Sequence, residues 1–249
     1  MMMTEGVSPV IEVVGLRKSY GELAAVDGLE FDVRRGEIVG LIGANGAGKT
    51  TTLQSLAGLL KPDEGLLKVC GRSVVNEAIE VKRLLAYIPD SNQPYDLLTV
   101  REHLTFVGLA YSVPRLEEKI DAVLEEVGLF EKRDQQASTL SRGMIQKLSL
   151  ACALIWDPVA IVLDEPLTGL DPRGIRAMKD LIRMRAESGM AFLLSSHLLE
   201  LVETICHRVL VVDRGKRIAF GSLAEIRASF DLPEKASMED IYLAMTVSR

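Results

Sequence analysis

The chain has 249 residues, of which 48% are hydrophobic and 26% charged, with a net charge of −6 at pH 7. This is the composition of a globular protein with a large core, and the acidic balance disfavours general adhesion to nucleic acid or acidic lipid. The three cysteines follow no metal-ligand or disulfide spacing, so we expect reduced thiols in the core of a cytosolic protein.

The sequence indicates neither a secretory signal nor a membrane span. The first ten residues, MMMTEGVSPV, contain no basic region and no long apolar run. The most apolar stretch, residues 148–163, is interrupted by Asp157 and Pro158, so it is shorter than the roughly 20 residues that a span needs.

Short apolar strands alternate with helical patterns, which is typical of an α/β fold with a largely parallel sheet. In chain order, an alternating strand is expected at 29–33, a buried strand at 37–43 and a helix at 51–60. Further buried strands are expected at 84–88, 159–163, 191–195 and 208–212.

Strand patterns are missing between Thr99 and about Ala153. Thr99 and Glu102 form a capping box at the start of a helix, and residues 115–128 form an amphipathic helix that Gly128 ends. We therefore predict a single domain at 1–230, with an α/β core at 1–92 and 154–230 and a helical subdomain at 93–153. A helical tail is predicted at 231–249.

The segment GANGAGKT, residues 43–50, matches the phosphate-loop pattern G-x-x-x-x-G-K-[ST] between a strand and a helix. Its glycines let successive N–H groups turn toward phosphate oxygens. Lys49 is expected to reach the terminal phosphates and Thr50 to ligate Mg²⁺. The sequence therefore predicts a nucleotide phosphate site at Gly43, Asn45, Gly46, Ala47, Gly48, Lys49 and Thr50.

Two adjacent carboxylates, Asp164 and Glu165, follow the apolar strand at 159–163. An isolated pair of this kind is usually a solvated strand end, but a preceding phosphate loop favours function. Asp164 suits a role as a partner of Mg²⁺. Because adjacent residues of an extended chain face opposite ways, Glu165 is the candidate to polarise an attacking water.

Three further residues allow structural interpretations. Asp171 before Pro172 is a good helix N-cap, Ser141 in LSRGM is another, and a histidine at a strand end, such as His197, is usually structural. However, ligands of doubly wound sheets collect at the carboxyl ends of the strands, where Asp164 and His197 would both lie.

Together, these motifs resemble the ATPase subunit of ATP-binding cassette (ABC) transporters over essentially the full chain. The resemblance rests on an ordered set: Tyr20 in KSYG, the phosphate loop, LSRGM at 140–144, LDEP at 163–166, GLD at 169–171 and His197. It implies a P-loop NTPase (RecA-like) core with a mostly parallel sheet, an N-terminal antiparallel β part and an inserted α-helical subdomain.

The resemblance also implies a role for individual residues. Tyr20 would stack on the adenine, and Thr51 would contact the α-phosphate. Thr50 and Asp164 would hold Mg²⁺. The catalytic residues would be Lys49 on the β- and γ-phosphates, Glu165 on the hydrolytic water and His197 on the γ-phosphate.

In this family, the segment like LSRGM starts a helix that faces an ATP held by a second subunit. Ser141 would offer its hydroxyl, Gly143 would let the backbone approach the phosphate, and Asp171 would communicate between the two sites. A helix start alone does not explain Gly143, because glycine costs about 1 kcal/mol relative to alanine inside a helix.

The implied partners are separate membrane subunits and a second nucleotide-binding subunit, either another copy or a paralogue. No nucleic acid is expected. The implied location is cytoplasmic, on the inner face of the cell membrane, and the implied cofactors are ATP and Mg²⁺.

The sequence departs from the usual family pattern at two places. Arg142 and Met144 replace the first glycine and the glutamine of Leu-Ser-Gly-Gly-Gln. Asp90 replaces the glutamine that usually follows the proline, and Gln93 lies three residues on. The Asp90 carboxylate could approach Mg²⁺ or the attacking water. Both departures resemble the exporter branch that pairs with ABC-2-type membrane subunits, which implies export.

Three other functions fit less well. Relatives that act on DNA or ribosomes tend to carry tandem cassettes, zinc modules or long coiled coils, none of which this sequence shows. A non-hydrolysing switch would not need the full set of Lys49, Asp164, Glu165 and His197. A small-molecule kinase would leave LSRGM and His197 unexplained. The cargo is not indicated by the sequence.

Overall fold

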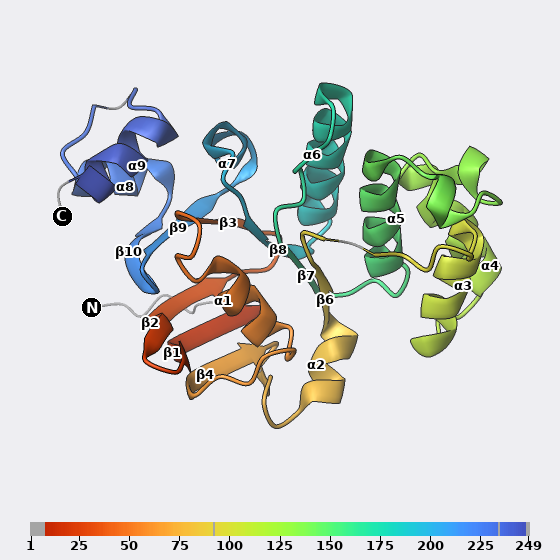
Figure 1. Cartoon of the computed structure of the whole chain (residues 1–249), viewed down its shortest axis with the longest axis horizontal. Helices are drawn as coiled ribbons and strands as arrows, with labels where there is room; N and C mark the ends of the chain where they lie inside the picture. The colour runs from red at the N-terminus through yellow and green to blue at the C-terminus, as the bar shows by residue number, and fades with distance from the viewer. Residues whose placement is uncertain (1–7, 92, 234, 248–249) are drawn as a thin grey trace.

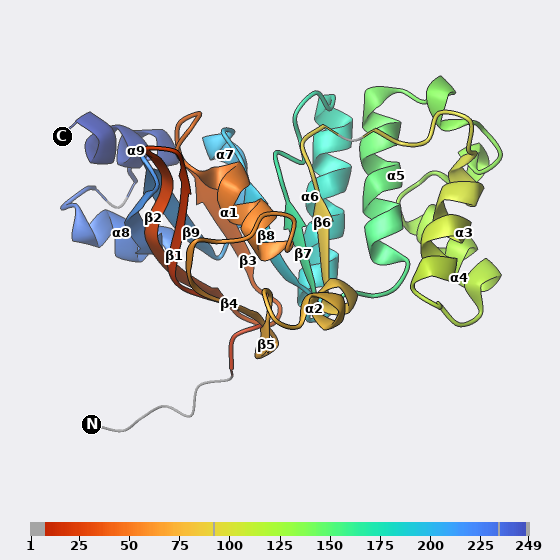
Figure 2. The ribbon, with the colours of Figure 1, turned by 60° about the horizontal axis from the view of Figure 1, so that its bottom comes forward.

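The computed structural model describes residues 8–91, 93–233 and 235–247 (Figure 1). The first seven residues, part of the segment interpreted above as lacking a secretory signal, lie outside the described residues. Figures 1 and 2 show a central sheet with β1, β2, β4 and α1 on one side, and with α6 and then α5, α3 and α4 at one end.

The central sheet has the strand order β10-β9-β3-β8-β7-β6. Its pairs are parallel except for the antiparallel pair of β9 and β10. The bounds are β3 Ile38–Ile42, β6 Leu85–Ile88, β7 Ala160–Leu163, β8 Ala191–Ser195, β9 Arg208–Asp213 and β10 Lys216–Gly221. Strands β3, β7 and β8 are buried along their whole length, because the sheet is covered on both faces. The predicted α/β fold class is confirmed.

The N-terminal part forms a separate antiparallel sheet with the order β2-β1-β4-β5. Its strands are β1 Ile11–Tyr20, β2 Leu23–Val33, β4 Glu64–Val69 and β5 Arg72–Ser73. The inner faces of β1 and β2 pack with α1, Lys49–Leu56, and with one face of the central sheet in a single hydrophobic cluster. The predicted antiparallel part is therefore present, and it covers the phosphate-loop side of the core.

The opposite face of the sheet is covered by helices. They are α6 Pro172–Glu187, α7 Leu199–Ile205, α8 Leu223–Ser229 and α9 Met238–Val247; α2, Ala78–Leu84, connects β5 to β6. Met238 and Ile241 of α9 are fully buried in a cluster with Val202 of α7 and Ile42 of β3. The C-terminal helix is therefore packed against the core beside the helix that follows His197.

Between β6 and β7 the described residues form helices and turns. The helices are α3 Val100–Ala110, α4 Leu116–Glu126 and α5 Arg142–Leu154, with 3₁₀ turns at Phe130–Lys132 and Ala137–Thr139. The capping box is present, since the Thr99 hydroxyl accepts from the Glu102 N–H and Glu102 accepts from the Thr99 N–H. Gly128 follows α4 with φ +68°, which suits glycine at a helix end.

Two sequence-based expectations are wrong in detail. The helix expected at 51–60 ends at Leu56, because Gly58 adopts φ +66° and the N–H groups of Leu59 and Leu60 both bond to the carbonyl of Gln54. The expectation that the cysteines lie in the core is wrong for Cys70, which is exposed after β4. Burial raises the pKa of the Cys152 thiol to about 12, as expected for an inert core thiol.

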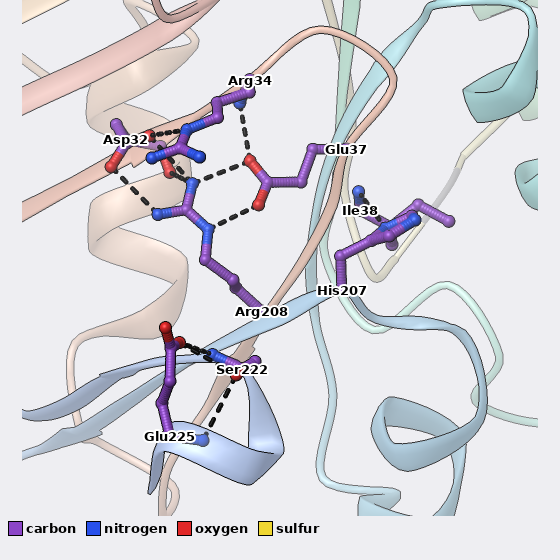
Figure 3. Close-up of polar contacts among 8 residues, drawn as sticks. All are labelled: Asp32, Arg34, Glu37, Ile38, His207, Arg208, Ser222 and Glu225. Atoms are coloured by element: carbon purple, nitrogen blue, oxygen red, sulfur yellow. Dashed lines mark hydrogen bonds and ion pairs between the residues drawn. The ribbon is translucent and has the colours of Figure 1, made fainter. Parts of the chain in front are cut away.

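The two sheets are tied together by an ion network around Arg208, shown in Figure 3. At the start of β9, the Arg208 guanidinium donates to Asp32 of β2 at 2.8 Å and to Glu37, just before β3, at 2.8 Å. Its Cζ also lies 4.5 Å from the centre of the Phe220 ring. Next to it, the Ile38 N–H donates to His207 Nδ1 at 3.0 Å. These contacts join residues up to 176 positions apart.

Replacing Arg208 with leucine is expected to lower the free energy of unfolding by about 3 kcal/mol, because the Glu37 carboxylate would stay buried without its cation. Denaturant titration measures this change. In the control Lys216→Leu, which removes an exposed pair with Asp27, the loss is expected to be below about 1 kcal/mol. An Arg208→Leu protein as stable as the wild type would contradict a stabilising role.

The same network predicts a pH dependence. Arg208 holds the pKa of Asp32 below its usual value through its hydrogen bonds. The stabilisation from Asp32 is therefore complete above the unfolded pKa of about 3.9 and is lost as the pH falls through the lower folded pKa. The stability difference between wild type and Arg208→Leu should narrow below about pH 4.

Candidate nucleotide-binding site

The site lies at the carboxyl ends of three neighbouring parallel strands, in the order β3, β8 and β7. Gly43 directly follows β3, Asp164 directly follows β7, and His197 follows β8 by two residues. The expected common edge is therefore present. A cavity of about 480 Å³ lies there, and its lining includes Tyr20, Leu23, Ala25, Asn45, Gly46, Gly48, Lys49, Thr50, Thr51, Asp90, Asp164 and Glu165.

The glycines of the phosphate loop are required for different reasons. A Cβ atom on Gly43 would lie 2.3 Å from the carbonyl oxygen of Val212, and one on Gly48 would lie 2.3 Å from that of Ala25. Gly46 has open space around it but adopts φ +80°. The first two therefore permit close packing of the backbone, and the third permits the turn that directs N–H groups into the cavity.

Lys49 is a buried cation without an anionic partner among the described residues. The residue is 7% exposed, and Nζ contacts the carbonyl oxygens of Gly43 at 2.9 Å and Ala44 at 3.3 Å. The two carbonyl groups accept from two of the three N–H donors of the ammonium but do not neutralise its charge, and an isolated buried charge is costly. A bound phosphate would supply the negative charge that compensates Lys49, so the loop fits a nucleotide phosphate.

Asp164 and Glu165 both form hydrogen bonds with Ser195, a residue that no sequence motif indicated. The Ser195 hydroxyl donates to Asp164 Oδ1 at 2.6 Å and accepts from the Glu165 N–H at 2.9 Å. The available sequence signal was a hydroxyl at the end of an apolar strand, two residues before His197. Only the pairing of β8 with β7 brings it to the acidic pair.

The backbone at Glu165 is not extended, so the alternation of side chains that was expected for Asp164 and Glu165 does not apply to them. Glu165 adopts φ +49°, the left-handed region that is uncommon for residues other than glycine. Its Oε2 accepts from the N–H of His197 at 3.3 Å and lies 2.7 Å from His197 Nδ1. His197 does not line the cavity, and it reaches the site through Glu165.

The cavity offers oxygen donors for a divalent cation. The Thr50 hydroxyl and the carboxylates of Asp164 and Asp90 all line it, whereas Gln93 lines two other hollows. No group of three or more His, Cys, Asp or Glu side chains suited to a metal occurs within the described ranges. Mg²⁺ is usually held by one or two carboxylates together with substrate phosphates, so this donor set fits Mg²⁺ bound with a nucleotide.

Gly43 and Ala47 line neither this cavity nor the second one, which has a volume of about 690 Å³ and lies between the starts of α5 and α6. Ser141, Gly143 and Asp171 line it, and it shares no lining residue with the first cavity. Ser141 caps α5 by accepting from the Met144 N–H at 3.4 Å, and Asp171 caps α6 by accepting from the Gly174 N–H at 2.7 Å. The structural interpretation of both as N-caps therefore holds.

Gly143 is not required by the fold of this chain. Its φ is not positive, and a Cβ atom there would meet only the Leu170 side chain, at 3.3 Å. A small shift of that side chain would admit alanine, which is the better helix former by about 1 kcal/mol. The fold of the described residues therefore gives no steric or conformational reason for glycine at position 143.

A third hollow, of about 410 Å³, lies between β6 and the helices α3 and α5. Its lining includes four aromatic residues, Tyr87, Tyr95, Tyr111 and Trp156, and the rings of Tyr111 and Trp156 are stacked at 3.9 Å. Trp156 Nε1 is buried and finds no hydrogen-bond acceptor among the described residues. Exposed apolar side chains lie on the same helical part of the chain: Tyr95, Leu97, Phe106 and Leu109.

Comparisons with known proteins agree with this geometry. Residues 26–168 match the ABC transporter family. The chain is 39% identical over 223 residues to the Nod factor export ATP-binding protein I of Ralstonia nicotianae, covering 89% of this chain and 70% of that protein. It is 33% identical over 219 residues to the linearmycin resistance ATP-binding protein LnrL of Bacillus subtilis, covering 87% and 70%.

Solved structures show the same similarity. An ATP-binding subunit of an ABC transporter superposes with a TM-score of 0.89 at 33% identity, over 95% of this chain and 99% of that one. The ADP conformation of MJ1267, an ATP-binding cassette of an ABC transporter, superposes with a TM-score of 0.80 at 26% identity, over 95% and 99%. Among the described residues, no helix has the length and apolar character to cross a bilayer. The chain therefore belongs to the ABC transporter family, as an ATP-binding subunit.

Proposed function

We propose that this chain hydrolyses Mg-ATP and that two nucleotide-binding chains, either two copies or this chain and a paralogue, close head to tail around two ATP molecules. The cycle drives export through separate membrane subunits at the cytoplasmic face of the membrane. The observation that most supports this proposal is the division of the site residues between two cavities with no shared lining residue. A second chain is needed to bring Ser141 and Gly143 to a nucleotide held at Lys49.

In the proposed nucleotide complex, Lys49 and the loop N–H groups bind the phosphates, and Thr51 contacts the α-phosphate. Tyr20, which is 51% exposed beside Leu23 at the rim of the cavity, stacks on the adenine. Mg²⁺, held by Thr50 and Asp164, would neutralise charge on the phosphates.

Hydrolysis needs a positioned water and stabilised charge rather than a covalent intermediate on the protein. Glu165 lines the cavity and can polarise that water, while His197, bonded to Glu165, senses the γ-phosphate. Asp90 lies in the same cavity, where its carboxylate can approach Mg²⁺ or the water. Asp171, at the second cavity, communicates between the two sites.

The membrane subunits are proposed to dock at the aromatic hollow between β6 and the helices. Its apolar lining and the exposed apolar side chains around it suit a protein partner with an apolar docking surface. Export is proposed because relatives carry the names Nod factor export and linearmycin resistance. The cargo would be selected by the membrane subunits.

Phosphate release from purified chain in Mg-ATP tests the proposal, with Lys49→Ala as the comparison. The wild type is expected to release phosphate at a rate that rises more steeply than linearly with protein concentration, because the active form is a dimer. Lys49→Ala is expected to lose ATP binding and phosphate release together. No release by the wild type, even when co-purified with a membrane protein encoded beside it, would contradict the proposal.

A further inference from the structure

Ser195 ends β8, the strand that lies between β3 and β7, and it is fully buried. It does not line the nucleotide cavity. Its hydroxyl donates its one hydrogen to the Asp164 carboxylate and accepts a hydrogen bond from the Glu165 N–H. A single side chain therefore forms hydrogen bonds with both acidic residues at the end of β7.

The two bonds constrain two different features of the site. The bond to Asp164 Oδ1 restricts rotation of a carboxylate that is itself 3% exposed. The bond from the Glu165 N–H engages the backbone of a residue that has a left-handed conformation and whose Oε2 lies beside His197. A non-glycine residue keeps such a conformation only when its surroundings determine it.

An ordinary buried hydroxyl in this chain behaves differently. Ser55, also fully buried, donates to the carbonyl of Thr51 one turn earlier in α1. That carbonyl belongs to a helix, and removal of the hydroxyl leaves no charged group without a partner. Removal of the Ser195 hydroxyl would leave a buried carboxylate and a backbone N–H without that partner.

We propose that Ser195 is a positioning residue for ATP hydrolysis. It orients the Asp164 carboxylate for the metal, and it holds the backbone of Glu165 so that the Glu165 carboxylate reaches the attacking water. Ser195 acts through these two residues and touches neither the nucleotide nor the water. This inference rests on the proposed hydrolytic function.

The variant Ser195→Ala tests it through four measurements: melting temperature, ATP affinity in EDTA, the Mg²⁺ dependence of ATP binding, and kcat. ATP affinity in EDTA is expected to stay unchanged, because the phosphate loop is intact. The Mg²⁺ concentration for half-maximal binding should rise, and kcat should fall, each by about 10- to 100-fold, as for other partners of metal-ligating carboxylates. Ser195→Thr, which restores the hydroxyl, should recover both, and Ser55→Ala should behave as the wild type.

Wild-type kcat and Mg²⁺ dependence in a folded Ser195→Ala protein would overturn the inference. So would a loss of ATP affinity in EDTA equal to the loss of kcat, because that pattern indicates general damage to the fold. If Ser195→Ala does not fold, Ser195→Cys, which keeps nearly the same volume with a weaker donor, takes its place with the same expectations. If the wild type hydrolyses no ATP, the proposed function fails, while the Mg²⁺ dependence of ATP binding still decides whether Ser195 orients Asp164.

Discussion

Replacing Glu165 with glutamine is expected to reduce ATP turnover by about 10²- to 10⁴-fold, the usual contribution of a positioned general base. Glutamine keeps the size of the side chain and can still accept a hydrogen bond from the His197 N–H. It has no negative charge with which to polarise a water. ATP should therefore bind normally and remain unhydrolysed, so that the variant accumulates as an ATP-bound dimer.

Phosphate release and sedimentation in saturating Mg-ATP measure the two parts of this expectation. Glu187→Gln, at the exposed end of α6 and outside both cavities, serves as the control and should behave as the wild type. An unchanged hydrolysis rate in Glu165→Gln would remove Glu165 from its proposed role. A variant that stays monomeric with bound ATP, even with the membrane partner present, would contradict head-to-tail closure.

Replacing Gly143 with alanine is expected to leave the fold intact and to impair assembly. Within the chain, the added methyl group meets only the end of the Leu170 side chain, and alanine favours helix α5. In the proposed dimer, the same methyl group would stand between the N-terminus of α5 and the partner's terminal phosphate. The close approach of the phosphate to backbone N–H groups would be lost.

We therefore expect Gly143→Ala to have a melting temperature equal to or above that of the wild type and an unchanged ATP affinity as a monomer. ATP-driven dimerisation and kcat should both fall, by about 10-fold for each 1.4 kcal/mol of phosphate contact that is lost. In Gly143→Asp, which adds a negative charge near the phosphate, dimerisation and kcat should fall further than in Gly143→Ala. Wild-type dimerisation in both variants would show that the phosphate does not approach residue 143.

The elements that sequence patterns predicted correctly are those whose signal lies within a short segment of the chain. The phosphate loop follows from its glycines and Lys49, and the helix start at Thr99 follows from a capping box only four residues long. The buried strands β3, β7 and β8 read as continuous apolar runs because they are covered on both faces. Each of these features involves few residues that are close in the chain.

The errors arise where local preference competes with the surrounding structure. The sequence from 51 to 60 remains helix-compatible, but the turn at Gly58 ends the helix at Leu56. Glu165 is not a residue type that favours a positive φ, and its conformation coincides with a bond to Ser195, which lies 30 positions later. No pattern in the segment around Glu165 could have indicated it.

The sequence by itself determined the family and the positions of its motifs, because a phosphate loop, an acidic strand end and a family signature each need particular residue types at short, fixed spacings. Only the tertiary structure decided which of those residues share a cavity, why Glu165 has its conformation, and that Ser195 and Arg208 bond residues of other strands. The physical reason is that these contacts depend on which strands and helices are neighbours. Burial of apolar surface along the whole chain sets that arrangement, not the preference of any one segment.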